Sequence, residues 1–477
     1  MIKILDSLSG KKEILEPTKN RPLRLFVCGP TVYDYPHIGN YRTFAAFDLI
    51  VNYLRSQKYK VFYLQNITDI DNKIIKKGID EKTSPLLIAK KYEKIYHEGE
   101  KKLNIGSVTK YARATGHIKE ITKQVQTLLK KGYAYKIKDG WYFNIAKFID
   151  YGKLSGRTSL QAEDAVTRID ESVNKINKGD FALWKFPDTF TDSELDDKAK
   201  GKKFLIDGGE PLWKTPLGWG RPGWHIEDTA ITEKYFGTQY DIHGGATELK
   251  FPHHEAEIAQ QESASGKKPL VKIWMHMGIL FVDGKKMSKS LNNFISVDDF
   301  LKKHRVNVYR YIIASYHYRS PINYTEQLAK DAQKTLDNIS GFLAKLSLLK
   351  NKSSSVKIEI KKYDGAFCAA MNDDLNSPEA LAVIFTFINE INPKIWNLSK
   401  KDGQIITRWL NEKLKIFKIF LKPLKIPANI KLLALKRELL RTNKQFAQSD
   451  LLRKKIEALG YSIEDTPVGQ MITKIES

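Results

Sequence analysis

The stretch 23–71, which opens LRLFVCGPTVYDYPHIGN, decides the fold of this chain. An apolar run at 23–27 is typical of a buried strand, and a turn-rich loop separates it from an apolar-periodic segment at 43–56 that predicts a helix. A second apolar run, 61–64, follows that helix. The strand–helix–strand order predicts a βαβ unit and therefore an α/β domain built on a Rossmann-like parallel sheet.

Polar residues follow both predicted strands. Cys28 comes directly after the first strand, and Thr68 lies in the string NITDID that follows the second. Ligands of open parallel sheets bind beyond the carboxyl ends of the strands, so both residues are expected near a ligand.

Two short strings carry the chemistry, PHIGN at 36–40 and KMSKS at 286–290. His37 stands just before the predicted helix, and Gly39 leaves room for the backbone to approach a nucleotide. Asn40 keeps a hydrogen-bond donor. In this order the two strings resemble the ATP-handling signatures of class I aminoacyl-tRNA synthetases, although Asn40 replaces the usual last histidine.

The second string supplies mobile positive charge. Activation of a carboxylate by ATP builds negative charge on the phosphates as pyrophosphate leaves, and Lys286 and Lys289 are suited to stabilise that charge. Ser288, with Gly284 before it, favours a loop that can close and reopen. The same string alone would more often be a solvated surface loop.

Composition bounds the class of protein. The chain has 477 residues with 79 Lys+Arg against 55 Asp+Glu, a net charge of +24, which favours a polyanionic partner. A lysine-rich proteome is an alternative source of this charge. Two cysteines exclude a disulfide framework and indicate a reducing cytosol. Neither a signal peptide nor a membrane span is evident, so a soluble cytoplasmic protein is expected.

The sequence texture predicts five segments. A catalytic domain at 1–111 and 218–305 is split by an inserted domain at 112–217, whose polar part, 191–209, is expected to be mobile. The helical domain at 306–422, as the resemblance to class I synthetases implies, would contact a tRNA stem. A small basic unit at 423–477 would bind the anticodon.

Further strings resemble the cysteinyl-tRNA synthetase family over nearly the whole chain. They are CGPTVY from Cys28, GWHIED at 223–228, DIHGG at 241–245 and FPHHEAE at 251–257. The resemblance implies a zinc ion that binds the substrate thiolate. Its ligands would be Cys28, Asp228, His253 and Glu257, with Asp228 where the family pattern has cysteine.

The residues themselves make this substitution plausible. His253 and Glu257 are four apart and would share one helix face, as a metal pair requires. Aspartate is a known zinc ligand and carries the same single charge as a thiolate. Three interpretations of Asp228 stay open: a direct ligand, which we favour, a carboxylate beside a weaker three-ligand site, or loss of the metal.

The resemblance also implies an amino-acid pocket lined by Gly29, Thr68, Trp224 and His243, with Thr68 near the substrate ammonium group. His254 is expected to be structural.

The expected function is ATP-dependent ligation of L-cysteine to its tRNA through cysteinyl-adenylate. ATP with Mg²⁺ would be handled by His37, Gly39, Asn40, Lys286, Ser288 and Lys289. The partners would be ATP, L-cysteine and the tRNA for cysteine, and the protein is expected to be a monomer. Two alternatives are a cysteine ligase of thiol metabolism that uses an amino sugar, which the basic tail disfavours, and a non-catalytic RNA-binding paralogue.

Overall fold

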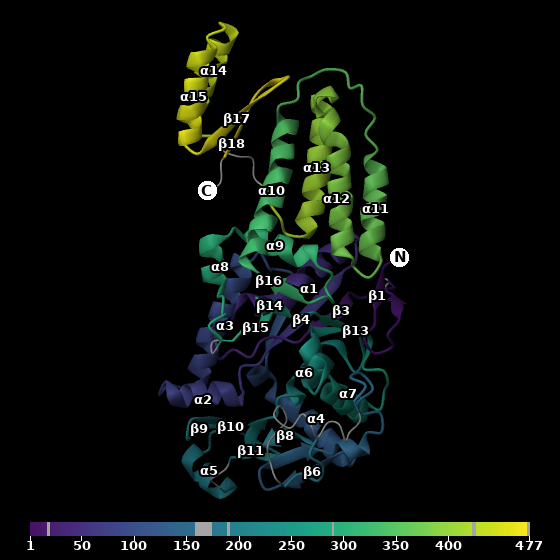
Figure 1. Cartoon of the computed structure of the whole chain (residues 1–477). Helices are drawn as coiled ribbons and strands as arrows, with labels where there is room; N and C mark the ends of the chain where they lie inside the picture. Colours follow the sequence, from purple (N-terminus) through teal and green to yellow (C-terminus); the bar gives the residue numbers. More distant parts are fainter. Residues whose placement is uncertain (17–19, 158–173, 188–190, 289–290, 422–425, 475–477) are drawn as a thin grey trace. The chain divides into compact units, whose positions relative to one another are not determined.

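The structure is a computed structural model that describes residues 1–16, 20–157, 174–187, 191–288, 291–421 and 426–474 (Figure 1). It contains two compact units. The first comprises Met1–Lys303 with the short segments Tyr316–Tyr324 and Asp373–Leu375. The second comprises the other C-terminal residues.

A parallel five-stranded sheet forms the centre of the first unit. Its strand order is β13-β12-β3-β4-β5, and every neighbouring pair is parallel. The strands are β3 (Leu23–Val27), β4 (Val61–Ile67), β5 (Lys110–Arg113), β12 (Tyr240–Ala246) and β13 (Val271–Met277). The predicted parallel-sheet α/β class is therefore confirmed.

Strand β3 lies between β4 and β12, although β12 comes more than 200 residues later in the chain. The chain therefore continues to opposite sides of β3, and such a switch point opens a crevice at the carboxyl ends of the strands. Cys28 is the first residue after β3, so its position at this crevice follows directly from the topology.

Helices surround this sheet. They are α1 (Ile38–Ser56), α2 (Asn72–Asp80), α3 (Pro85–Lys102), α4 (Ile118–Lys130), α6 (Ile226–Phe236), α7 (His253–Ser265) and α8 (Val297–Lys303). Helix α1 buries most of its surface, including Phe47 and Leu54, which explains its nearly continuous apolar sequence. A small sheet of order β15-β14-β16 is formed by strands β14 (Leu280–Val282), β15 (Lys285–Lys286) and β16 (Ile322–Tyr324). The string KMSKS begins at Lys286, the last residue of β15.

The insertion between β5 and β12 contains an antiparallel sheet of order β6-β7-β8-β11-β10-β9. Its strands are β6 (Ala134–Ile137), β7 (Gly140–Phe143), β8 (Phe181–Lys185), β9 (Phe204–Asp207), β10 (Glu210–Thr215) and β11 (Gly218–Pro222).

The polar segment 191–209, which was expected to be mobile, contains a helix and strand β9. Helix α5 (Asp192–Ala199) begins with a capping box made by Thr191 and Glu194. Leu195 and Ala199 are buried in a small core with Trp219. Leu195 and Ala199 are four residues apart and lie on one face of the helix. They pack against Trp219 of the neighbouring sheet, and this contact holds the otherwise polar segment in place.

The second unit is mainly helical. It contains α9 (Val306–Ser315), α10 (Glu326–Ser347), α11 (Ile360–Asn372), α12 (Ser377–Ile391), α13 (Lys400–Ile416), α14 (Ala428–Thr442) and α15 (Phe446–Ala458). A hairpin of β17 (Tyr461–Thr466) and β18 (Gly469–Lys474) follows, which the sequence reasoning did not anticipate. None of the described helices is long and apolar enough to cross a bilayer. The five predicted domain boundaries stay predictions.

Candidate active site

A cleft of about 760 Å³ opens at the crevice in the first unit. Eleven of the residues predicted for the site line it, and they come from segments more than 250 residues apart in the chain. Among the lining residues are Cys28, Gly29, His37, Gly39, Asn40, Thr68, Trp224, Asp228, His253, Lys286 and Ser288. His243 and Glu257 lie behind this lining, fully buried. Lys289 lies outside the described residues.

The two short strings meet in this cleft. The Ile38 N–H donates to the Ile295 carbonyl at 3.0 Å, a few residues beyond the basic loop. A methyl group added at Gly39 would lie 2.6 Å from Met287 Cε and 3.0 Å from His37 Nδ1. A larger residue at this position would displace the Met287 side chain and crowd the His37 ring, so glycine favours a start of helix α1 this close to the basic loop.

The start of α1 fixes the proton of His37. The Asn40 N–H donates to His37 Nδ1 at 3.1 Å, and the His37 N–H donates to Asn40 Oδ1 at 2.9 Å, a reciprocal cap. Because Nδ1 accepts a hydrogen bond, the ring proton lies on Nε2. Burial, and then the charge of Lys286, lower the pKa of His37 to about 4. His37 is therefore a neutral donor at physiological pH.

Lys286 is held by a partner that the sequence reasoning missed. Its Nζ forms an ion pair with Glu248, which also lines the cleft. Asn293 fixes the loop, because its Oδ1 accepts from the Ser288 N–H at 2.9 Å and its Nδ2 donates to the Lys286 carbonyl at 3.1 Å. Lys73 is a second lining cation that was missed, 5.3 Å from the ring of Tyr33. Lys73 lies in the first turn of helix α2, directly after the string NITDID, and this position was the signal that could have identified it.

The four predicted metal ligands converge at the base of the cleft, each offering one donor atom within 4.8 Å of the others. His253 Nε2 lies 3.0 Å from Asp228 Oδ2 and 3.2 Å from Glu257 Oε1. Cys28 Sγ lies 3.7 Å from the same Glu257 oxygen. Tetrahedral zinc with bonds of ~2.0–2.3 Å has donor–donor separations of roughly 3.3–3.6 Å, so the distances in this group are close to those of a ligand cage.

The donor set fits a cation for a second reason. Burial and the neighbouring acids raise the pKa of the Cys28 thiol, and burial and Asp228 raise the pKa of Glu257. Asp228 Oδ1 and Glu257 Oε2 are buried without a hydrogen-bond partner among the described residues. Acids concentrated in this way are costly unless a cation compensates them. The group can therefore bind a metal ion, and its thiolate and imidazole donors suit zinc.

The side chains predicted for the amino-acid pocket lie around this group. The ring of Trp224 stacks on His253 with centroids 4.4 Å apart. A methyl group at Gly29 would lie 1.8 Å from the Asn66 carbonyl oxygen, so only glycine fits there. The Thr68 hydroxyl donates to Glu227 Oε1 at 2.8 Å. Glu227 was missed because it precedes the more conspicuous Asp228.

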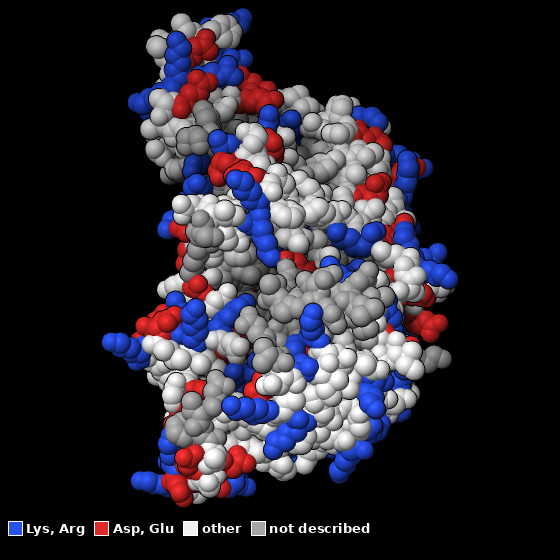
Figure 2. Space-filling model, turned by 60° about the horizontal axis from the view of Figure 1, so that its bottom comes forward, with Lys and Arg blue, Asp and Glu red and all other residues white. Residues whose placement is uncertain are grey.

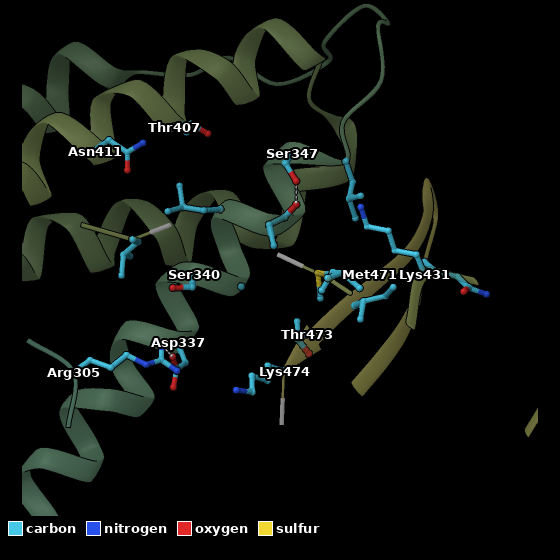
Figure 3. Close-up of a pocket in the computed structure, with 18 residues that line it drawn as sticks. Arg305, Asp337, Ser340, Ser347, Thr407, Asn411, Lys431, Met471, Thr473 and Lys474 are labelled. Carbon is cyan, nitrogen blue, oxygen red and sulfur yellow. Dashed lines mark hydrogen bonds and ion pairs between the residues drawn. The ribbon is translucent and has the colours of Figure 1, made fainter. Parts of the chain in front are cut away.

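The second unit has a cleft of its own, between helices α10 and α13 and the hairpin (Figure 3). Apolar and polar residues line it, among them Arg305, Asp337, Lys431 and Lys474. Basic side chains are spread over the face of the molecule in Figure 2, with acidic ones among them. On that face the positive charge does not form one isolated patch.

Comparisons with known proteins agree with this arrangement. Residues 14–334 match the family of tRNA synthetases class I (C) catalytic domain, and residues 366–424 match the DALR domain. A methionyl-tRNA synthetase of Mycobacterium tuberculosis has a similar fold, with a TM-score of 0.57 at 14% identity over 84% of this chain and 90% of that one. The fold and these matches define a class I aminoacyl-tRNA synthetase.

Relatives of higher identity narrow the family. A cysteine–tRNA ligase of Thermococcus gammatolerans is 38% identical over 496 residues, covering 100% of this chain and 99% of the relative. One of Coxiella burnetii is 40% identical over 479 residues, covering 98% of each. The chain belongs to the cysteine–tRNA ligase family.

Proposed function

We propose that this chain ligates L-cysteine to its cognate tRNA, using ATP and releasing AMP and pyrophosphate. One observation carries the proposal: Cys28, Asp228 and His253 of the metal-type group line the same cleft as His37 and Lys286. Residues that could recognise a thiol and residues that could bind phosphates therefore line the same cleft.

The chemistry has two steps. A carboxylate oxygen of cysteine attacks the α-phosphorus of ATP, the bond to the β-phosphate oxygen breaks, and pyrophosphate leaves with its negative charge. A ribose hydroxyl of the terminal adenosine of tRNA then attacks the carbonyl carbon, and AMP leaves. The protein contributes position and charge rather than covalent bonds.

The residues of the cleft divide this work. His37 donates from Nε2 to a phosphate oxygen, and the Nδ2 amide of Asn40 adds a second donor. Lys286 and Lys289 stabilise the charge of the departing pyrophosphate, together with Mg²⁺. Lys286 would have to leave its ion pair with Glu248 in order to bind phosphate. Exposed ion pairs contribute little free energy, so this exchange of partners costs little.

Selectivity for cysteine rests on the metal group. Cys28, Asp228, His253 and Glu257 would hold zinc, which supplies a bond to the substrate thiolate that serine cannot match. Packing alone separates such near-isosteres poorly, by about 1–3 kcal/mol. Thr68, oriented by Glu227, would receive the substrate ammonium group, with Gly29 and Trp224 shaping the pocket and His243 supporting it from behind.

Partners and compartment follow from the same proposal. The tRNA for cysteine would contact the helical second unit, whose basic C-terminal part, 423–477, would bind the anticodon. We expect a monomer acting in the cytoplasm, which suits an active site that depends on the reduced thiol of Cys28.

Aminoacylation of tRNA with labelled cysteine tests the function. Lys286→Ala should lower kcat at least about a hundredfold, as expected for losing a charged contact made in the transition state. Lys285→Ala is the matched control, because Lys285 is its neighbour on β15 but lies outside the cleft lining. Folded wild-type protein that charges no tRNA with cysteine would refute the proposal. Charging of an amino sugar instead would favour the thiol-metabolism ligase.

A further inference from the structure

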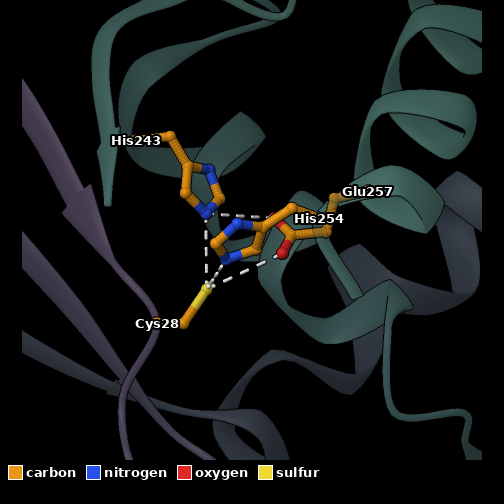
Figure 4. Close-up of side chains that lie close together, drawn as sticks. All are labelled: Cys28, His243, His254 and Glu257. Atoms are coloured by element: carbon orange, nitrogen blue, oxygen red, sulfur yellow. Dashed lines mark hydrogen bonds and ion pairs between the residues drawn. The ribbon is translucent and has the colours of Figure 1, made fainter. Parts of the chain in front are cut away.

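A second set of four potential metal donors lies next to the first. It consists of Cys28, His243, His254 and Glu257, again with one donor atom from each within 4.8 Å of the others (Figure 4). It shares Cys28 and Glu257 with the first set and replaces Asp228 and His253 by two imidazoles. His254 had been assigned a structural role only.

The distances in this set are those of a ligand cage. Cys28 Sγ lies 3.2 Å from His254 Nε2 and 3.3 Å from His243 Nε2. His243 Nε2 lies 3.7 Å from Glu257 Oε2. That oxygen is the one left without a hydrogen-bond partner among the described residues, while Oε1 faces the first set. The two oxygens of Glu257 thus serve two different sets.

Both additional imidazoles are held in the orientation that a metal ligand needs. The Nδ1 atom of His243 lies 2.7 Å from the Tyr240 hydroxyl, and that of His254 lies 2.9 Å from His276 Nε2. These contacts leave each Nε2 aimed at Cys28, as outer partners do for histidines that bind metals.

The backbone also makes room for this arrangement. A methyl group at Gly245 would lie 2.8 Å from His254 Cε1 and 3.0 Å from its Nε2. Trp274 stacks on His243 with centroids 4.3 Å apart. The rings are therefore fixed by packing as well as by hydrogen bonds.

Charge and donor type favour the second set in this particular chain. With Asp228 in the first set, one thiolate and two carboxylates bring three negative charges to Zn²⁺ and leave a net charge of −1. The second set brings one thiolate, one carboxylate and two neutral imidazoles, and the sum with Zn²⁺ is zero. In a fully buried site the neutral sum costs less. Zinc also accepts imidazole readily, whereas the first set offers it a second hard oxygen.

We propose that this chain has a second zinc position, formed by Cys28, His243, His254 and Glu257, beside the position that faces the substrate cleft. Because two donors are shared, one ion occupies one position at a time. This inference rests on the proposed zinc-dependent function and adds a position, behind the cleft lining, to which the ion can withdraw.

The test measures zinc per chain and the number of imidazole ligands by X-ray absorption, on the full-length protein loaded with Zn²⁺. Asp228→Ala removes a donor of the first set only. It should keep one zinc per chain, now with two imidazoles. Adding His254→Gln to Asp228→Ala removes a donor from both sets and should weaken zinc binding at least about a hundredfold. His117→Gln, a buried histidine outside both sets, controls for the loss of a buried ring.

Three outcomes would overturn the inference. They are loss of zinc from Asp228→Ala, retention of zinc by the double variant, and two zinc ions per wild-type chain. Circular dichroism of each variant separates unfolding from loss of a ligand, and His243→Gln in place of His254→Gln repeats the test if the first double variant unfolds. Failure of the proposed function is a different result, because it appears as wild-type protein that does not catalyse cysteine-dependent pyrophosphate exchange, whatever its zinc content.

Discussion

At Gly39 the start of helix α1 lies close to Met287 of the basic loop. Gly39→Ala would push a methyl group against Met287 and the His37 ring. Overpacking of this kind costs about 1–3 kcal/mol, so we expect the KM for ATP to rise roughly tenfold in pyrophosphate exchange. Shortening the neighbour in Gly39→Ala/Met287→Ala should restore part of the loss.

The control for this substitution is Gly106→Ala, because a methyl group there meets nothing within 4 Å. An unchanged KM in Gly39→Ala would contradict the close approach of the two strings.

His37 leads to a pH prediction at the same scale. Its pKa of about 4 means that the ring is neutral from about pH 5 upward, so the donor on Nε2 should not titrate between pH 6 and 8. The kcat/KM for ATP should therefore show no step near the ordinary histidine pKa of about 6.5. A step at that pH that disappears in His37→Gln would show that His37 acts as a cation.

At the scale of elements, His97 of helix α3 lies between two glutamates of the same helix. Its Nδ1 lies 2.8 Å from Glu100 Oε2 and its Nε2 lies 3.6 Å from Glu93 Oε1. The hydrogen bonds to Glu100 and then Glu93 raise the pKa of His97 to about 9. A raised histidine pKa stabilises the fold fully below the unfolded value of about 6.5, and the stabilisation is lost as pH rises through about 9.

His97→Gln should therefore lower the thermal midpoint most at pH 6 and hardly at all at pH 10. The ring is partly exposed, so after screening by solvent the effect is about 1 kcal/mol, or a few degrees. Lys94→Gln on the same helix is the control, since its ion pair with Glu98 is exposed. An equal loss at both pH values would exclude the charged contact.

Helix α5 tests whether the inserted polar segment is folded. Leu195→Ala removes a fully buried side chain from the small core with Trp219 and should cost about 2–5 kcal/mol locally. Limited proteolysis should then cut within 191–209 much faster than in wild type. Asp197→Ala, exposed on the same helix, should leave the rate unchanged. Rapid cleavage of the wild-type segment would instead support the original expectation of mobility.

At the scale of the whole molecule, the net charge of +24 predicts a strong salt dependence of tRNA binding. Counterion release should lower the affinity at least about tenfold between 50 and 200 mM salt. Cysteine-dependent pyrophosphate exchange without tRNA serves as the control and should change much less. A tRNA affinity that is flat with salt would mean that the basic side chains spread over the face in Figure 2 do not contact the phosphates.

The sequence by itself determined the class of fold and the family resemblance, and it predicted the four residues of the first potential metal set. Periodic apolar runs specify strands and helices locally, and short motifs such as PHIGN and KMSKS can be identified from the sequence alone. It did not find Glu248 as the partner of Lys286, the packing of α5, or the role open to His254. Those depend on contacts between residues distant in sequence.

Only the tertiary structure decided which donors share one space. His254 follows His253 directly in the chain, yet successive residues of a helix point about 100° apart, so one ring faces Asp228 and the other faces His243. Nothing in the order of letters separates a ligand from its neighbour in such a pair. The packing of helix α7 beside the ends of strands β3 and β12 does so, because it brings Cys28 and Glu257 close to both rings.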